Sequence, residues 1–99
     1  MKKLLTLLAL TISFSMNAQV QSAGTDNSGT VASAMGNNTT ASGSYSIAMG
    51  AFSTASGIAS TAMGSGTTAS GIASTAMGGS TTASGHYSTA MGLITTASD

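Results

Sequence analysis

Small apolar residues recur along this chain at a fixed spacing of seven positions. An alanine occupies every seventh position from Ala34 to Ala97, and a glycine follows two positions later from Gly36 to Gly92. The residue between them alternates between methionine and serine. The methionines of this alternation are Met35, Met49, Met63, Met77 and Met91. The full repeat is therefore 14 residues long and consists of two unequal halves.

A seven-residue period is also the period of a coiled coil, but the residue types exclude a helix. A glycine in every heptad costs about 1 kcal/mol relative to alanine in a helix. The position before each repeated alanine is nearly always threonine or isoleucine, which are β-branched residues that favour strands. There is no second column of leucine or isoleucine and there are no flanking charges. The repeats are therefore predicted to form short strands.

Each half of the repeat predicts one short strand followed by a turn that begins at the glycine. Two strands and two turns close one coil, and successive coils stack by parallel pairing at about 4.8 Å. The predicted fold is an all-β parallel β-roll, a solenoid of 14-residue coils with two short strands per coil. Five coils would give a rod of roughly 24 Å. The predicted turn glycines are Gly43, Gly50, Gly57, Gly64, Gly71, Gly78, Gly85 and Gly92.

The alternation of side chains along a strand assigns the two faces of each strand. The repeated alanine is used by both halves of every coil, so it is predicted to point inward, between two closely spaced sheets. The predicted roll interior consists of Ala48, Ala55, Ala62, Ala69, Ala76, Ala83 and Ala90. The Met/Ser position must then face outward, so that one sheet presents Thr or Ile with Met and the other presents Thr with Ser.

A column of methionines on one face of so thin a roll is an exposed apolar strip, and such strips mark interfaces. An interior filled with alanine also buries little apolar area for a domain of this size. We therefore expect an obligate oligomer that packs through this sheet. The predicted interface residues are Ile47, Met49, Met63, Met77 and Met91. The turns after the Ser halves carry more apolar and aromatic residues than the others, and we expect them near a neighbouring subunit.

The first 18 residues have the pattern of a secretory signal peptide. Lys2 and Lys3 precede an apolar run from residue 4 to 14, and Ala18 provides a small residue for cleavage. The run is shorter than the roughly 20 residues that span a bilayer. We predict a signal peptide over residues 1–18, a flexible lead-in over 19–28 and the repeat domain over 29–99.

The composition excludes several classes of function. With four formal charges and no cysteine, the chain has no basic patch for nucleic acid and no thiolate metal site. His86 is interpreted as a turn residue, and Asp26 and Asp99 are too far apart in the sequence to form an acid/base pair. The serine and threonine hydroxyls have no base to activate them. We expect neither an enzyme nor a site for a cofactor, metal or small-molecule substrate, and we attribute the glycosylation sequons at residues 37–40 to chance.

The units of the repeat resemble those of a known family. They read GSYSIAMGAFSTAS, GIASTAMGSGTTAS, GIASTAMGGSTTAS and GHYSTAMGLITTAS. These units are similar to the head repeats of trimeric autotransporter adhesins of Gram-negative bacteria, the YadA-like heads, over about residues 29–99. The resemblance implies a left-handed parallel β-roll and three chains around one axis, a homotrimer. It also implies secretion, display at the outer membrane on the cell surface, and adhesion to extracellular matrix, to surfaces or to other cells.

Two departures from the family pattern qualify this implication. The family usually has Val or Ile where this chain has Thr and Met, which gives a softer interface. The neck, stalk and membrane anchor that follow the head in the family are absent, and Asp99 stands where a glycine is due. We interpret the chain as truncated, with membrane contact only through an anchor outside it. The sequence also leaves open an ice-binding solenoid whose outer Ser halves form a Thr-x-Ser ladder, as at Thr68 and Ser70.

Overall fold

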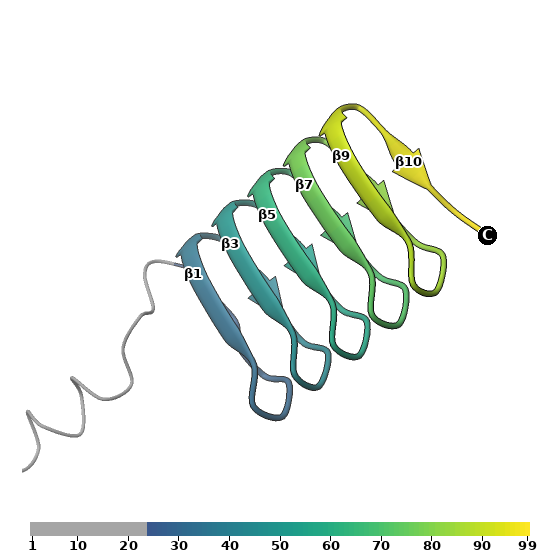
Figure 1. The fold of residues 1–99 in the computed structure, drawn as a ribbon. Coiled ribbons are helices and arrows are strands. Elements are labelled where there is room, and N and C mark those ends of the chain that lie inside the picture. The colour runs from purple at the N-terminus through teal and green to yellow at the C-terminus, as the bar shows by residue number, and fades with distance from the viewer. Residues whose placement is uncertain (1–23) are drawn as a thin grey trace, which may run out of the picture.

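The structure is a computed structural model that describes residues 24–99, and the predicted signal peptide lies outside the described residues. All the regular secondary structure between residues 24 and 99 is β-strand, in ten strands that wind into successive coils along one axis (Figure 1). The strands form two five-stranded parallel sheets, and each coil contributes one strand to each sheet. The predicted all-β parallel solenoid with 14-residue coils is thereby confirmed.

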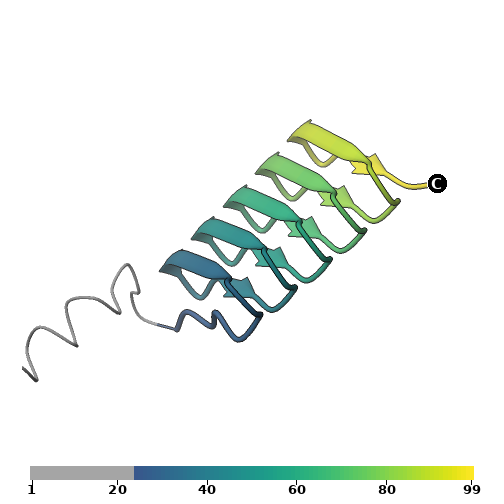
Figure 2. The same cartoon turned by 60° about the horizontal axis from the view of Figure 1, so that its bottom comes forward.

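The two sheets consist of strands of different length. The first sheet contains five-residue strands, β1 (Ser33–Asn37), β3 (Ile47–Ala51), β5 (Thr61–Ser65), β7 (Thr75–Gly79) and β9 (Thr89–Leu93). The second contains two-residue strands, β2 (Thr40–Ala41), β4 (Thr54–Ala55), β6 (Thr68–Ala69), β8 (Thr82–Ala83) and β10 (Thr96–Ala97). Figure 2 shows the long strands in one layer and the short strands in the layer behind it. We call these layers the Met sheet and the Ser sheet.

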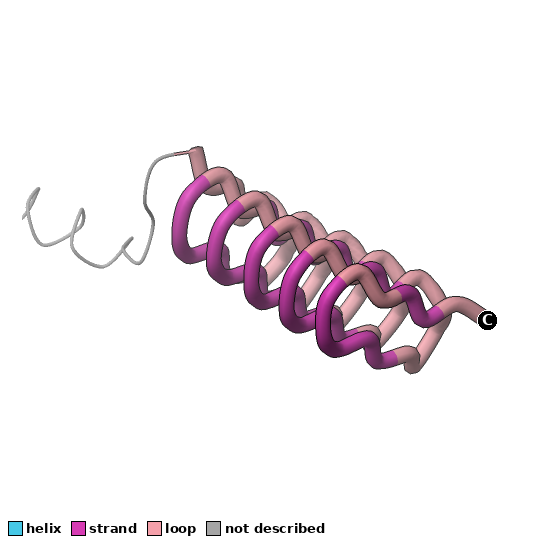
Figure 3. The backbone as a smooth tube through the Cα atoms, turned by 90° about the horizontal axis from the view of Figure 1, so that it is seen from above, coloured by secondary structure: helices cyan, strands magenta, loops and turns pink. Residues whose placement is uncertain are grey.

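Neighbouring coils are paired without any offset in the repeat. In the Met sheet Met49 of β3 is opposite Met63 of β5, and in the Ser sheet Ala55 of β4 is opposite Ala69 of β6. Identical positions of successive repeats therefore lie side by side, and each position of the repeat forms a column along the roll. The stacked tube in Figure 3 shows the same arrangement from above.

Backbone hydrogen bonds join the turns of successive coils, as they join the strands. The backbone N–H of Tyr45 donates to the carbonyl oxygen of Thr30 at 2.8 Å, and that of Phe52 donates to the carbonyl oxygen of Asn37 at 2.9 Å. The same bond recurs in later coils, for example from Ala59 to Ser44 at 2.7 Å. Because backbone polar groups are expensive to leave unpaired, these bonds make each turn part of the coil-to-coil ladder.

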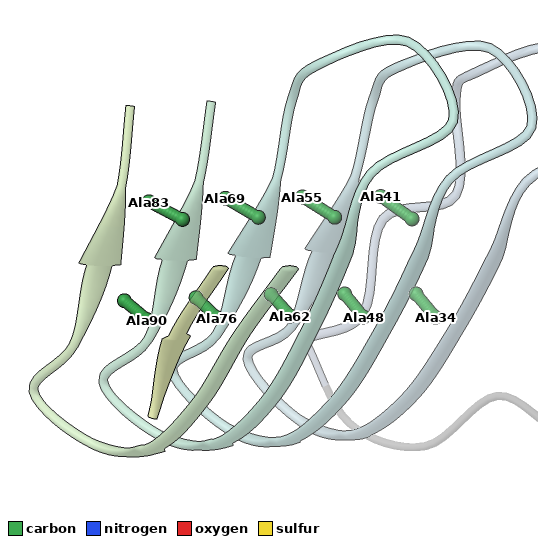
Figure 4. Packing of buried hydrophobic residues seen from close by; sticks show 9 residues of the cluster. All are labelled: Ala34, Ala41, Ala48, Ala55, Ala62, Ala69, Ala76, Ala83 and Ala90. Atoms are coloured by element: carbon green, nitrogen blue, oxygen red, sulfur yellow. The ribbon is translucent and has the colours of Figure 1, made fainter. Parts of the chain in front are cut away.

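The interior of the roll is lined by the repeated alanines. Figure 4 shows the alanines of the two sheets as two rows of methyl groups in the space between the sheets. The structure places all seven predicted interior alanines there, with Ala34 and Ala41 completing the rows. Every one of them is at most 4% exposed. Each methyl group contributes only about 0.8 kcal/mol on burial, so the alanine interior by itself is a weak source of stability.

Two columns of hydroxyl groups complete the interior. From Thr39 to Thr81, the Ser or Thr two positions before each alanine points the same way as that alanine and is buried, as at Ser60 and Thr67. In some coils the hydroxyl donates to a nearby carbonyl oxygen: Ser74 Oγ donates to Gly71 at 2.8 Å, and Ser53 Oγ to Met49 at 3.0 Å. Among residues 24–99, five buried hydroxyls have no hydrogen-bond partner in the chain. They belong to Thr39, Ser46, Ser60, Thr67 and Thr81.

Half of the predicted turn glycines lie elsewhere than we expected. Gly50, Gly64, Gly78 and Gly92 are the fourth residues of five-residue strands in the Met sheet. The φ angles of this column reach +123° at Gly64, a backbone conformation that side chains rarely adopt. Glycine thus bends the strand without ending its pairing, and the turn follows it. The other four, Gly43, Gly57, Gly71 and Gly85, lie in bends two residues after the ends of the strands of the Ser sheet.

A position with positive φ recurs in every turn and is rarely glycine. Its φ angle lies between 52° and 61° at each non-glycine residue of the set. These residues are Val31, Asn38, Tyr45, Phe52, Ala59, Ala73, Ser80, Tyr87 and Ile94. A side chain in this left-handed conformation costs roughly 1–2 kcal/mol. From Tyr45 onward, each of these residues donates a backbone hydrogen bond to the preceding coil, which offsets part of this cost.

The roll begins before the boundary predicted at Gly29. The N–H of Asp26 donates to the carbonyl oxygen of Thr39 at 2.8 Å, and the N–H of Ala41 donates to the carbonyl oxygen of Asp26 at 2.6 Å. Asp26 therefore pairs with β2 as an isolated parallel bridge. The end of the predicted lead-in already belongs to the first coil, because the free edge of β2 provides backbone groups that Asp26 can pair with.

Candidate interaction surfaces

The column of methionines runs along the outer face of the Met sheet. We call Met35, Met49, Met63, Met77 and Met91 the Met column. Met49, Met63 and Met77 are half-buried by their neighbours along the column, whereas Met91 at the last coil is 61% exposed. Ile47, the remaining residue of the predicted interface, is exposed at the start of β3. The structure thus aligns all five predicted interface residues on one face, and no other part of residues 24–99 covers them.

The Ser sheet presents a polar counterpart on the opposite face. We call Ser42, Ser56, Ser70, Ser84 and Ser98 the Ser column, and all of them are exposed. The threonines two positions earlier, such as Thr54 and Thr68, are half-buried beside it. This face therefore offers hydroxyl groups to water along the whole roll, and it carries no large apolar side chain.

The turns that connect the Ser sheet to the Met sheet form one edge of the roll. Each of its four turns carries a large apolar side chain that is exposed. These residues, which we call the Tyr/Ile edge, are Tyr45, Ile58, Ile72 and Tyr87. Adjacent turns are tied together at His86, where Nδ1 accepts a hydrogen bond from the N–H of Ile72 at 3.2 Å. The edge is therefore an apolar strip fixed to the coil ladder.

The opposite edge is less regular. Its turns carry Phe52 near one end of the roll and Leu93 with Ile94 near the other, all exposed. Between them stand two turns with small or polar residues, 65–66 and 79–80. The apolar character of this edge is therefore interrupted in the middle of the roll, unlike that of the Tyr/Ile edge.

Comparison with protein families gives one match for these repeats. The model of the YadA head domain repeat, which spans two copies of the repeat, matches residues 28–53, 41–67, 55–79 and 69–93. These overlapping matches advance by one coil each and together run from residue 28 to 93 of the 99-residue chain. The chain belongs to the YadA head repeat family. Neither the comparison with curated proteins nor that with solved structures gave a match.

Residues 24–99 hold no group of three or more His, Cys, Asp or Glu side chains placed to bind a metal ion. Nor does any helix in that range have the length and apolar character needed to cross a membrane. The described residues present four long surfaces, of which the Met column and the Tyr/Ile edge are the two continuous apolar ones.

The left-handed conformation of the exposed edge residues was not predicted from the sequence. The side chains most exposed at the edges stand on the left-handed residues, for example Tyr45, Phe52 and Tyr87. Glycine is the usual signal for such a position, and among the described residues only Gly24 and Gly66 supply it at this turn position. Because the other turns use ordinary residues at the same position, the sequence shows a period there but no conformational signature.

Proposed function

We propose that this chain forms the head of a trimeric adhesin on the bacterial cell surface. Three copies pack side by side with their long axes parallel, and the surfaces left outward bind extracellular matrix or other cell-surface ligands. The observation that carries the proposal is the match of the YadA head repeat over residues 28–93. The pattern of a secretory signal peptide in the first 18 residues supports export of the chain.

The need for a partner follows from what the roll buries. In residues 24–99 the buried side chains are alanine, serine and threonine, and the largest fully buried ones are threonines. A domain of this size depends on a large buried apolar area for independent stability. The Met column supplies apolar area that can be buried only by another molecule. Packing of copies through the Met sheet adds the buried apolar area that a single roll lacks.

A pair of charge variants tests the trimer. Met63→Lys with Met77→Lys places two charges in the proposed interface, where burial of an unpaired charge is strongly unfavourable. We expect light scattering to give the mass of a monomer for this variant and of a trimer for the original chain. Ser70→Lys with Ser84→Lys adds the same charges to the Ser column and should leave the trimer intact. A trimer that survives the Met substitutions would refute the interface.

Adhesion is tested separately from assembly. Microspheres coated with the purified chain should be retained on immobilised extracellular matrix or on cell layers, and uncoated microspheres should not. Lack of retention on every such surface would count against the adhesive role even if the trimer forms. The ice-binding alternative is not carried further, because no observation favours it and the exposed residue of its ladder is serine, which lacks the methyl group of threonine.

A further inference from the structure

The Tyr/Ile edge is an exposed apolar surface that the interior of the chain does not use. Tyr45 is 62% exposed, Ile58 52% and Tyr87 81%. Unlike the opposite edge, it carries a large apolar side chain in each of its four turns, so it is continuous over the same coils as the Met column from Met49 to Met91. A continuous exposed strip of this kind requires a partner.

A closed trimer requires two different surfaces on each chain. In a ring of identical subunits each contact is heterologous, so one patch of a chain meets a different patch of the next. This chain offers two continuous apolar strips that run parallel to its axis, the Met column on a face and the Tyr/Ile edge, whose isoleucines and tyrosines occupy two adjacent positions of the turn. A face and an edge of a flat roll can meet in a pinwheel of three rolls, in which each edge abuts the face of its neighbour.

The Met column and the Tyr/Ile edge are also matched in height. A rotation about an axis parallel to the roll keeps every coil at its own level. Tyr45 and Ile58 directly precede the strands that carry Met49 and Met63, and Ile72 and Tyr87 stand in the same relation to Met77 and Met91. The column spacing is the same on both surfaces, since both are set by the strand spacing of about 4.8 Å. Each edge residue therefore has a methionine of the neighbouring copy at its own level.

We propose that the Tyr/Ile edge of one copy packs against the Met column of the next, and that this edge-to-face contact repeats three times around the trimer. The inference rests on the proposed function, because it presupposes the trimer. Tyr45 and Tyr87 pair with Met49 and Met91 of the neighbour through sulfur–aromatic contacts, and the two isoleucines pair with Met63 and Met77. The occupant of the edge is a second copy of this chain.

Charge and area both favour a second copy. Neither the Met column nor the Tyr/Ile edge carries a charged residue, and the acidic residues of the described chain, Asp26 and Asp99, lie at its two ends. Identical copies can therefore approach without like-charge repulsion along the contact. A fully buried aromatic side chain contributes about 150–250 Å², so the two tyrosines supply a substantial part of the roughly 800 Å² per partner of a standard interface.

Cysteine pairs test the contact, because the chain contains no cysteine of its own. The full chain is prepared with Ile72→Cys and Met77→Cys together, oxidised, and separated on a denaturing gel without reductant. A disulfide needs a Cα separation of less than about 7 Å, which residues at one level on closely packed surfaces can reach. We expect covalent dimers and trimers and no larger species, because a ring of three closes. Each single cysteine variant should remain unlinked.

A staggered pair provides the matched control. Ile58→Cys with Met91→Cys places the two thiols two coils apart, about 10 Å along the axis. We expect at least about tenfold less linked product than from the level pair, because the separation exceeds the reach of a disulfide. If the first level pair does not keep the β signal in circular dichroism, Ile58→Cys with Met63→Cys repeats the test one coil away.

The outcomes separate this inference from the proposed function. Linking by Met77→Cys alone would mean that the Met columns meet each other, and the edge-to-face contact would be wrong. No linking by either level pair in a chain that light scattering shows to be trimeric would also overturn the contact, while the trimer would stand. A chain that is monomeric in solution would refute the trimer and this contact together.

Discussion

The Met sheet and the Ser sheet begin from the same local sequence, an alanine and a glycine separated by one residue, yet their backbones follow different paths. In the Met sheet the glycine continues a five-residue strand with φ of +123° at Gly64. In the Ser sheet the strand has two residues, and Gly71 lies buried in a bend without a positive φ. The same spacing of small residues therefore supports a bent strand on one side and an early turn on the other.

Both glycine columns share a close approach of the next coil. A Cβ atom added to Gly64 would overlap the carbonyl oxygen of Gly78, and one added to Gly71 would overlap the carbonyl oxygen of Gly85. Glycine is required in both sheets because the backbones of successive coils meet there. Only the Met sheet adds a conformational requirement. The difference between the sheets can therefore be measured by substituting one glycine in each.

The largest expected effect comes from these glycines. Gly64→Ala and Gly71→Ala should each lower the free energy of unfolding by more than about 3 kcal/mol, at the upper end of single substitutions, because a backbone must move. Gly64→Ala should cost about 1–3 kcal/mol more, since it also imposes a strained φ. Denaturant unfolding followed by circular dichroism measures both. Equal losses of unfolding free energy in Gly64→Ala and Gly71→Ala would contradict the conformational difference between the sheets.

The shared interior predicts the next largest effect, and here the sheets should behave alike. Ala62→Leu in the Met sheet and Ala69→Leu in the Ser sheet each force extra carbon atoms between the two layers, and overpacking typically costs about 1–3 kcal/mol. Thermal unfolding should show similar losses for both. Met63→Leu, adjacent to Ala62 but facing outward, should cost less than about 1.5 kcal/mol. A larger loss for Met63→Leu would place the methionine inside the roll.

The interior hydroxyls provide a smaller test. Thr67 Oγ1 is buried without a partner, so Thr67→Val should raise the free energy of unfolding by about 1 kcal/mol. Ser53 belongs to the same column and donates to Met49 at 3.0 Å, so Ser53→Ala should lower it by about 1 kcal/mol. We expect denaturant unfolding to show changes of opposite sign in the free energy of unfolding for these two variants. A loss of stability in both variants would show that the Thr67 hydroxyl is hydrogen-bonded.

The smallest effect concerns the left-handed turn positions. Ala59 has a φ of 58°, whereas Ala51 ends β3 and has no positive φ. Ala59→Gly should stabilise the roll by about 0.5–1 kcal/mol, because relief of the left-handed strain exceeds the entropy that glycine adds to the unfolded chain. Ala51→Gly should destabilise it by about 0.5–1 kcal/mol. Melting temperatures of the two variants should therefore move in opposite directions.

Much of the fold could be predicted because a repeat averages out local ambiguity. A single stretch such as Ser60–Met63 could be read as strand or helix, but the strict return of alanine every seven residues requires a structure in which both halves of a coil share one interior. The side-chain alternation of a strand then places the methionines outward. The alignment of the methionines from Met49 to Met91 in one column could be predicted from the same periodicity.

The remainder could not be predicted because it depends on how one coil lies on the next. Gly50 and Gly57 each follow an alanine by two positions, yet Gly50 continues a strand and Gly57 lies in a bend after one. The left-handed conformations of Tyr45 and Phe52 are imposed by hydrogen bonds to the preceding coil. The pairing of Asp26 likewise depends on the free edge of β2, which its own sequence does not indicate.

The sequence by itself therefore determined the period, the number of strands per coil, the alanine interior and the sidedness of methionine and serine, because these depend only on spacing and on side-chain alternation. The tertiary structure decided the unequal strand lengths and the positions with positive φ. These depend on backbone contacts between residues 13 to 15 positions apart, such as Thr40 with Ser53 and Tyr45 with Thr30. Such contacts exist only once the coils are stacked.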